Sequence, residues 1–276
     1  MKKIVLILSL FIVLAAQGCD MDSFLFNDKK ISSYKLPGNN IPDSLIKQVT
    51  FKSGGNTLYG YWVKGGNFFE RYTVLYCHGN KDNIDNYWDR VMYLHQLGVN
   101  VFIFDYRGFG MSEGTSSEEG IHEDAKAAWN FINTNYGVDP GLLFLYGYSL
   151  GNVASIYLAA EVVSPGKLIA ECPFASANSL TQGSLVLDIP SGWLTKGNFN
   201  NAEEIKKITT PLLLLHGSDD DFVRFRDNGK VVFDNAPEPK TLIVVPGAVH
   251  TNIPEKMGIS EYLGTIKVFL ELHGNY

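Results

Sequence analysis

The chain has 276 residues, of which 45% are hydrophobic and 19% charged, and its formal net charge is −6 at pH 7. This composition is typical of a globular protein with enough apolar material for one large core, and a single α/β domain of this length is common. No basic stripe or run of Lys and Arg occurs in the sequence, so we expect no nucleic-acid partner.

The N-terminal residues differ in character from the rest of the chain. Lys2 and Lys3 precede an apolar stretch from Ile4 to Leu14 that is interrupted only by Ser9. This stretch is shorter than the roughly 18 residues of a membrane-spanning helix and is typical of a signal peptide. The sequence that follows, ending at Cys19, resembles the cleavage region of a bacterial lipoprotein, in which the cysteine is lipidated and becomes the first residue.

The lipoprotein resemblance implies a signal peptide over residues 1–18, lipidation of Cys19 and a membrane-anchored protein of the cell envelope. The pattern departs from the commonest one, because Ala16 stands where Leu is usual. Two alternatives stay open: ordinary cleavage at the same bond, which would give a secreted or periplasmic protein, and an uncleaved anchor. Ala16 and Gly18 also satisfy the small-x-small rule of ordinary cleavage. Lipoprotein processing and both of these alternatives place the protein outside the cytosol.

Residues 19–44 are polar and rich in turn-forming residues, and we interpret them as a tether or an extended N-terminal arm. As a flexible coil, such a segment would span about 25–30 Å. Residues 45–276 are expected to form the globular domain.

Strand and helix patterns alternate along this domain. Extended runs are expected at residues 46–52, 57–63, 72–77, 100–104, 142–146, 168–172, 211–216 and 241–245, and helices at 84–97, 118–136, 152–160, 224–235 and 259–272. The first two runs should form a hairpin around residues 53–56. The alternation predicts a mostly parallel, eight-stranded sheet with helices on both faces. Residues 174–200 interrupt it with scattered Gly and Pro and are interpreted as a short cap insertion.

The pentapeptide from Gly147 to Gly151 has the G-x-S-x-G pattern of a nucleophile elbow, centred on Ser149. A strand-like run precedes it and a helical run follows it, as this elbow requires. The two glycines lack the Cβ atoms that would clash where the chain reverses direction. The pentapeptide alone also occurs in surface turns, so its setting between strand and helix carries the functional interpretation.

A serine nucleophile needs a base and a carboxylate that orients the base. In open α/β sheets such groups gather at the carboxyl ends of strands. The strand at 211–216 is followed by three consecutive aspartates, Asp219 to Asp221, and the strand at 241–245 is followed by His250. The resulting order of serine, aspartate and histidine is the one expected of this architecture.

These segments resemble the α/β-hydrolase superfamily, and the resemblance extends over roughly residues 46–275. Residues 77–80 (Cys-His-Gly-Asn) resemble its oxyanion loop, and residues 105–112 its Asp-x-Arg-Gly-x-Gly-x-Ser turn. Residues 216–223 match its acid loop, H-G-x-x-D-x-x-V. The resemblance is to the small-cap esterases, lipases and thioesterases and to serine aminopeptidase-like relatives, and it implies the α/β-hydrolase fold.

The resemblance implies that Ser149 is the nucleophile and His250 the base. The offset within the acid loop favours Asp220 as the orienting acid, with Asp221 as the alternative. Glu171 also follows a strand-like run and is a more remote candidate for this acid.

The oxyanion hole is expected to consist of the backbone N–H groups of Leu150 and Asn80. Four further polar residues of these motifs are expected to be structural: His78, His216, Asp105 and Arg107. Asn152 stands where many relatives carry a second glycine, which suggests looser packing between the helix and the strand there.

Two cysteines of the domain, Cys77 and Cys172, end strand-like runs that should have another strand between them. The resulting separation of about 9.5 Å exceeds the roughly 7 Å that a disulfide allows, so both are expected to be reduced. The sequence contains no H-E-x-x-H motif, zinc-type cysteine pairs, EF-hand loop or glycine-rich nucleotide signature. We therefore expect neither a metal nor a cofactor.

The sequence thus predicts an exported serine hydrolase that cleaves an ester or thioester of a hydrophobic acyl substrate through an acyl-enzyme. The preference for an acyl substrate comes from the apolar residues of the cap stretch, namely Phe174, Leu180, Leu185, Val186, Leu187, Ile189 and Trp193. Two alternatives stay open: an aminopeptidase-like amide hydrolase and a non-catalytic lipoprotein scaffold.

Overall fold

The computed structural model describes residues 26–66, 70–183 and 197–271. The expected signal peptide and Cys19 lie outside this part of the chain. So do five of the apolar residues of the cap stretch, Leu185, Val186, Leu187, Ile189 and Trp193. No helix among the described residues is long and apolar enough to cross a membrane.

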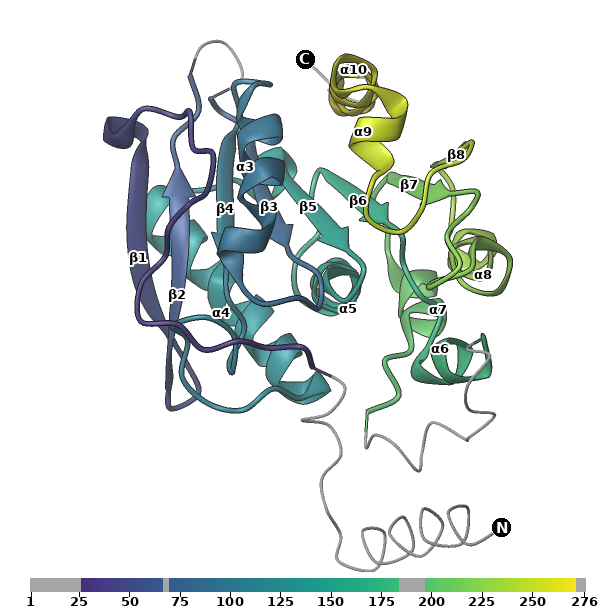
Figure 1. Ribbon diagram of the computed structural model, residues 1–276, viewed down its shortest axis with the longest axis horizontal. Coiled ribbons are helices and arrows are strands. Elements are labelled where there is room, and N and C mark those ends of the chain that lie inside the picture. The colour runs from purple at the N-terminus through teal and green to yellow at the C-terminus, as the bar shows by residue number, and fades with distance from the viewer. Residues whose placement is uncertain (1–25, 67–69, 184–196, 272–276) are drawn as a thin grey trace, which may run out of the picture.

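The core of the molecule is one eight-stranded sheet with the strand order β1-β2-β4-β3-β5-β6-β7-β8 (Figure 1). Its strands are β1 (Ile46–Ser53), β2 (Asn56–Val63), β3 (Thr73–Cys77), β4 (Asn100–Phe104), β5 (Leu143–Tyr148), β6 (Lys167–Glu171), β7 (Leu212–Gly217) and β8 (Lys240–Val245). β1 pairs with β2 and β2 with β4 in antiparallel orientation, and every other pair is parallel. The predicted mostly parallel sheet with an antiparallel start is therefore confirmed.

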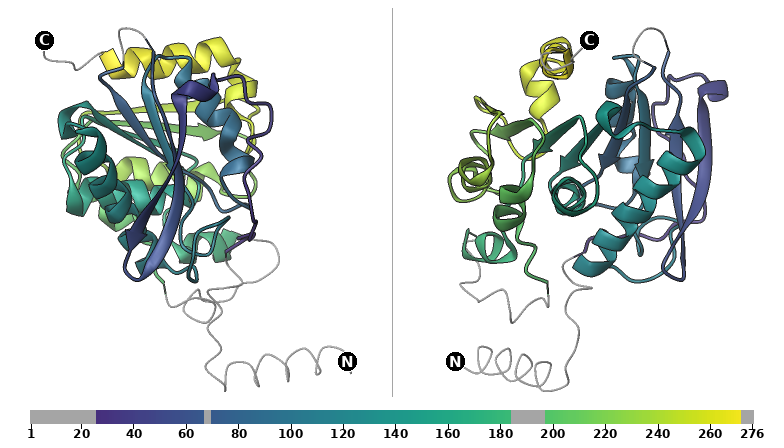
Figure 2. Two further views of the ribbon diagram at one scale, coloured as in Figure 1. Left: turned by 90° about the vertical axis from the view of Figure 1, so that its left-hand side faces the viewer. Right: turned by 180° about the vertical axis from the view of Figure 1, so that it is seen from behind.

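Helices cover both faces of the sheet. They are α3 (Trp88–His95), α4 (Glu118–Tyr136), α5 (Gly151–Tyr157), α6 (Ala177–Gly183), α7 (Asn201–Glu204), α8 (Gly229–Asn235), α9 (Ile253–Met257) and α10 (Ile259–Glu271). Figure 2 shows α4 and α5 on one side of the sheet and α3 and α10 on the other. Two hydrophobic clusters fill the two interfaces. The short helices α6, α7 and α9 were not predicted.

Local sequence explains the principal elements. All residues of β3 to β7 are buried, as expected for parallel strands covered on both faces, whereas β1 at the sheet edge alternates toward its end. α4 begins after Ser117, whose side chain accepts a hydrogen bond from the Gly120 N–H. It ends at Gly137, whose positive φ of 63° suits glycine.

The segment before β1 packs against the domain. Phe26 and Ile41 are both buried, and residues between them form isolated bridges to Asp82 and Gly110. Of the two interpretations of this segment, the extended arm agrees with residues 26–44, which are docked on the domain, and the flexible tether does not. Sequence periodicity gave no sign of this docking, because many of its contacts are with segments far along the chain.

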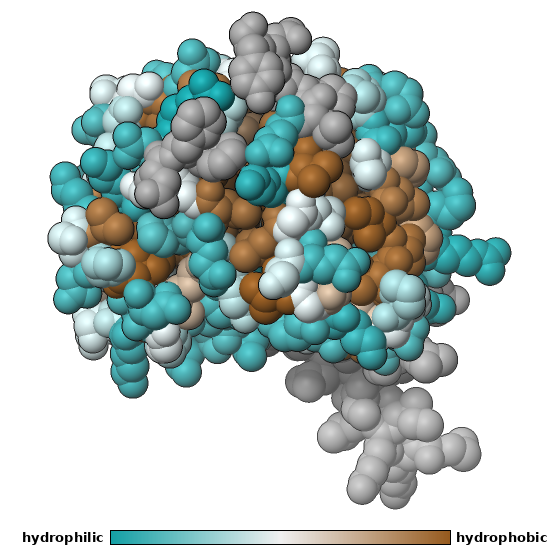
Figure 3. All heavy atoms as spheres, turned by 90° about the horizontal axis from the view of Figure 1, so that it is seen from above, coloured by the Kyte–Doolittle hydropathy of each residue, from teal (hydrophilic) through white to brown (hydrophobic). Residues whose placement is uncertain are grey.

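The described part of the cap stretch gives little support for an apolar lid. Phe174 is buried in the core beside Phe199, with ring centres 6.4 Å apart, and Leu180 packs against the same cluster. These two side chains belong to the core, so they do not support an apolar lid. Seen from above (Figure 3), hydrophobic residues show in more than one area of the surface, separated by polar residues.

The two cysteines of the domain are buried and free. β5 lies between β3, which ends at Cys77, and β6, which precedes Cys172. The predicted intervening strand and the reduced state are both confirmed.

Candidate active site

Ser149 lies at the sharp turn between β5 and α5. Its φ of 51° is unusual for a residue other than glycine, and such strained backbone is concentrated at functional sites. Its N–H donates a hydrogen bond of 3.0 Å to the Glu171 carbonyl oxygen. A side chain at Gly151 would overlap the carbonyl oxygen of Cys77, so the turn packs directly on the end of β3. The glycine requirement of the elbow is thus explained.

Asn152 ties this turn to the neighbouring strand. Its side-chain amide donates hydrogen bonds to the carbonyl oxygens of Ser149 at 3.0 Å and Glu171 at 2.9 Å. The residue is fully buried. The suggestion of looser packing at this position is therefore wrong, because the asparagine makes two bonds that glycine lacks.

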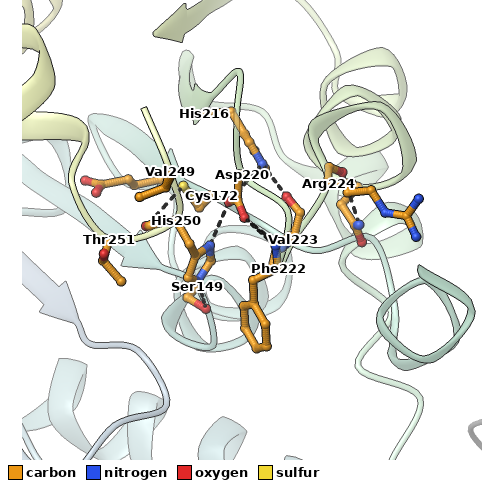
Figure 4. Close-up of polar contacts among 12 residues, drawn as sticks. Ser149, Cys172, His216, Asp220, Phe222, Val223, Arg224, Val249, His250 and Thr251 are labelled. Carbon is orange, nitrogen blue, oxygen red and sulfur yellow. Dashed lines mark hydrogen bonds and ion pairs between the residues drawn. The ribbon is translucent and has the colours of Figure 1, made fainter. Parts of the chain in front are cut away.

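The three side chains expected to form a triad meet at the carboxyl ends of β5, β7 and β8. His250 follows β8, and its ring lies between the other two (Figure 4). Its Nδ1 is 2.7 Å from Asp220 Oδ2, and its Nε2 is 2.9 Å from Ser149 Oγ. An imidazole in this position can accept the serine proton on one nitrogen while the carboxylate orients the other.

Asp220 is the aspartate of the acid loop that reaches His250. It is buried, whereas Asp219 and Asp221 are exposed. Its Oδ1 accepts hydrogen bonds from the N–H groups of Phe222 at 3.1 Å and Val223 at 2.8 Å. Burial alone would raise the pKa of this carboxyl, but hydrogen bonds from His216, His250 and Val223 outweigh it and hold the pKa well below its usual range. Asp220 is therefore ionised at neutral pH.

His216 supports the carboxylate from the other side. Its Nε2 lies 2.7 Å from the Val223 carbonyl oxygen and 3.4 Å from Asp220 Oδ2, and the side chain is fully buried. A Cβ atom at Gly229 would overlap the His216 ring, so this glycine allows α8 to pack closely on it. The expectation that His216 is structural agrees with these contacts.

The loop that carries His250 is fixed by its backbone. The Tyr148 hydroxyl donates to the His250 carbonyl oxygen at 3.0 Å, and Arg90 Nη2 lies 3.4 Å from the Thr251 carbonyl oxygen. Sequence reasoning missed both residues. Tyr148 belongs to the elbow motif but occupies one of its variable positions, and no motif pointed to Arg90.

Glu171, the remote candidate for the acid, has other partners. Its carboxylate is fully buried and lies 2.9 Å from Arg90 Nη1. It also accepts hydrogen bonds from the hydroxyl groups of Tyr146 and Tyr262. These contacts make Glu171 the centre of a buried polar cluster that joins β5 and β6 to α3 and α10.

Leu150 and Asn80, whose N–H groups are the expected oxyanion donors, lie in adjacent segments. Leu150 precedes α5 and is buried, and Asn80 lies in the loop after β3. The contact between Gly151 and the end of β3 brings these two segments together. Their role as donors stays a prediction.

The polar residues of the neighbouring loops have structural partners. His78 is fully buried, with Nε2 3.1 Å from Asp105 Oδ1. The same Asp105 oxygen accepts a hydrogen bond from the Ile84 N–H at 2.9 Å. Arg107 forms an ion pair of 2.7 Å with Asp124. These contacts agree with the structural roles expected for His78, Asp105 and Arg107.

Ligand atoms of Cys172, Asp220 and His250 lie within 4.8 Å of one another, which is the geometry of a potential metal site. The Asp220 and His250 atoms are already joined by a hydrogen bond. Burial raises the pKa of the Cys172 thiol well above its usual range, so the thiolate that a metal requires is disfavoured. The group is better suited to hydrogen bonding than to holding a cation.

Known proteins are similar to this chain in sequence and in architecture. Residues 70–196 match the family model Hydrolase_4, described as serine aminopeptidase, S33. The α/β hydrolase domain-containing protein 17C of Xenopus tropicalis is 31% identical over 203 residues, which are 72% of this chain and 62% of that protein. Protein YfhR of Escherichia coli K12, whose name states no activity, is 33% identical over 185 residues, 64% of this chain and 62% of that protein. The chain thus matches less than two thirds of the length of these relatives.

Solved structures show the same fold. An esterase from Pyrococcus furiosus superposes with a TM-score of 0.71 at 23% identity, covering 90% of this chain and 97% of that one. The esterase domain of a Rhodothermus marinus protein gives a TM-score of 0.61 at 22% identity, covering 80% and 97%. The chain has the α/β-hydrolase fold, and its sequence is similar to proteins of the α/β-hydrolase superfamily.

Proposed function

We propose that this protein is a serine hydrolase with Ser149 as nucleophile, His250 as general base and Asp220 as orienting acid. The observation that carries the proposal is the continuous pair of hydrogen bonds from Asp220 through His250 to Ser149, 2.7 and 2.9 Å long. Residues from three different strand ends meet there, so the arrangement is not a by-product of local sequence.

The reaction follows from these contacts. His250 Nε2 takes the proton of the Ser149 hydroxyl as Oγ attacks the substrate carbonyl carbon. The resulting oxyanion accepts hydrogen bonds from the N–H groups of Leu150 and Asn80. The protonated imidazole gives its proton to the leaving group as the bond to it breaks. A water molecule, deprotonated by His250, then hydrolyses the acyl-enzyme and restores the serine.

A carboxylic ester or thioester with an apolar part is the proposed substrate class. The side chains of Phe222 and Val249, which flank the triad, are 70% and 38% exposed. The Phe222 ring centre is 5.1 Å from that of His250. An apolar substrate group would cover this exposed surface as it binds. The names of the two solved structural neighbours, both esterases, support the same class.

Aminopeptidase-like amide hydrolysis is the second candidate, and the description of the matched family favours it. The same three residues would attack an amide, and the leaving amine would take the proton from His250. A panel of p-nitrophenyl esters of graded acyl length, compared with aminoacyl anilides, separates the two activities.

Labelling with a fluorophosphonate tests the hydrolase proposal directly. We expect covalent label on Ser149 in the native protein and none in Ser149→Ala. Asp220→Asn should slow labelling and ester hydrolysis by about 10⁴-fold, as the loss of this role does in other triads. Asp221→Asn is the matched control and should retain activity. A native protein that takes no label would leave the scaffold alternative standing.

The proposed location is the cell envelope, with the mature protein anchored through lipidated Cys19. The basic and apolar pattern of the first residues supports it. Incorporation of labelled palmitate, and accumulation of an unprocessed precursor in the presence of globomycin, test the anchor. A Cys19→Ser variant that is still labelled with palmitate would contradict it.

A further inference from the structure

The arm that precedes β1 is hydrogen-bonded to the loop that follows β3. The Asn27 N–H donates to Asn80 Oδ1 at 2.9 Å. The Lys29 N–H donates to the Asp82 carbonyl oxygen at 3.2 Å, and the Asp82 N–H donates to the Asn27 carbonyl oxygen at 2.9 Å. Residues 27–29 therefore run alongside residues 80–82. They form hydrogen bonds both with the backbone of that loop and with the Asn80 side chain.

The same arm continues to the loop after β4. The Ile31 N–H donates to the Gly110 carbonyl oxygen at 3.1 Å, and the Gly110 N–H donates to the Lys29 carbonyl oxygen at 3.0 Å. Further on, the Tyr34 hydroxyl donates to Asp105 Oδ2 at 2.6 Å. The other oxygen of Asp105 faces His78, at the start of the loop after β3. The arm thus reaches this loop directly at one end and through Asp105 at the other.

Apolar packing fixes the start of the arm. Phe26 is only 5% exposed, and its ring centre lies 6.3 Å from that of Phe109 and 6.1 Å from that of Phe199. Burial of an aromatic side chain contributes enough free energy to hold a segment that has no regular secondary structure of its own. The hydrogen bonds of Asn27 and Lys29 follow directly after this anchor.

We propose that residues 26–34 are a positioning element for the oxyanion loop, with the bond from Asn27 to Asn80 as its contact to the donor residue. The inference rests on the proposed function, in which the Asn80 N–H stabilises the oxyanion. Such a donor must lie about 2.7–3.1 Å from the developing charge, so small displacements of this loop weaken it. The Asn80 side chain accepts the hydrogen bond from the arm.

Two variants of Asn27 test the proposal in the full-length protein. Asn27→Pro removes the N–H donor, whereas Asn27→Ala keeps it and serves as the matched control. We expect Asn27→Pro to lower kcat for a p-nitrophenyl ester by about two- to tenfold, as the loss of one such hydrogen bond does, with KM unchanged. Asn27→Ala should retain the native kcat.

A double-mutant cycle separates coupling from general damage to the loop. Asn80→Leu removes the side-chain acceptor but keeps the backbone N–H, so it should lower kcat to a similar extent. Combined with Asn27→Pro, it should add little further loss, because both changes break the same bond. If the two losses of kcat multiply in the double variant, the proposal is overturned. It is also overturned if Asn27→Pro has the same kcat as Asn27→Ala.

Hydrogen exchange gives a readout that does not depend on activity. Amides of residues 78–84 should exchange faster in Asn27→Pro than in Asn27→Ala, and unchanged exchange in this loop would also overturn the proposal. If the native protein takes no fluorophosphonate label, the proposed function fails, and the exchange experiment still decides whether the arm holds the loop. If Ser149 is labelled at equal rates in both Asn27 variants, only the arm proposal fails.

Discussion

Phe222 is the most exposed large hydrophobic residue among those described, and its backbone N–H donates a hydrogen bond to the Asp220 carboxylate. We expect Phe222→Ala to raise KM for octanoyl esters by about three- to tenfold, because an apolar contact of about 1 kcal/mol is lost. KM for acetyl esters and kcat should change little. Steady-state kinetics on the two substrates measure the difference. Val231→Ala, at an exposed valine of α8, is the control, and equal changes on both esters would contradict a contact with the acyl chain.

Asn152 also permits a test at the scale of a single side chain. Asn152→Gly restores the residue that many relatives carry, but it removes two hydrogen bonds to carbonyl oxygens and empties a buried volume. We expect the free energy of unfolding to fall by about 2–3 kcal/mol and the rate of Ser149 labelling to fall with it. Urea titration and the labelling rate measure the two effects. Unchanged stability would show that the elbow does not depend on this side chain.

Single residues could be predicted from the sequence where a motif places them at the end of a strand. Ser149, Asp220 and His250 follow three apolar runs, and a parallel sheet brings such positions to one edge. The choice of Asp220 over its neighbours depended on spacing, and the structure explains it by burial. The exposure of Phe222 and the bonds of Asn152 depend on packing between distant segments, which no pattern in the sequence records.

At the scale of secondary structure elements, Arg90 joins α3 to the centre of the sheet and to the loop of His250. The ion pair with Glu171 is buried on both sides, so removing one partner leaves a charge without compensation. We expect Arg90→Met to lower the free energy of unfolding by about 3–5 kcal/mol. The double variant Arg90→Met/Glu171→Met should recover much of the loss, because no buried charge remains. A double variant as unstable as the single one, measured by urea unfolding, would contradict this account.

Secondary structure elements could be predicted where the sequence has a clear hydrophobic periodicity, and segments without such a pattern could not. The eight strands and the long helix α4 carry clear patterns, and their observed bounds lie within two residues of the expected ones. The arm at residues 26–44 carries none, since many of the hydrogen bonds that dock it are with residues about 50 or more positions further along the chain. The Arg90 cluster was hidden for the same reason, because its members come from α3, β5, β6 and α10.

For the molecule as a whole, Lys167 makes stability depend on pH in the alkaline range. Its side chain is buried at the start of β6, and its Nζ has no hydrogen-bond partner among the described residues, although it lies over the Phe269 ring. Burial lowers the pKa of this amine from 10.5 to about 8. Between these two values the unfolded chain binds more protons than the folded protein, so the free energy of unfolding rises with pH. Below about pH 8 the cost of the buried cation is fully present.

Lys167→Met tests this dependence. At pH 7 the variant should be more stable than the native protein by about 1–2 kcal/mol, less than the pKa change alone implies because the contact with Phe269 is also lost. The advantage should shrink as pH rises from 8 toward 10.5. Urea unfolding at pH 7 and pH 10 measures both values. An equal advantage at the two pH values would show that the ionisation of Lys167 is not its source.

The docked arm also bears on where the chain can be shortened. A recombinant version that starts at β1, chosen because the preceding residues look like a dispensable leader, would lose Phe26 and uncover the rings of Phe109 and Phe199. The truncated product would then expose a new apolar surface that favours aggregation. Trimming just ahead of Phe26 avoids both problems.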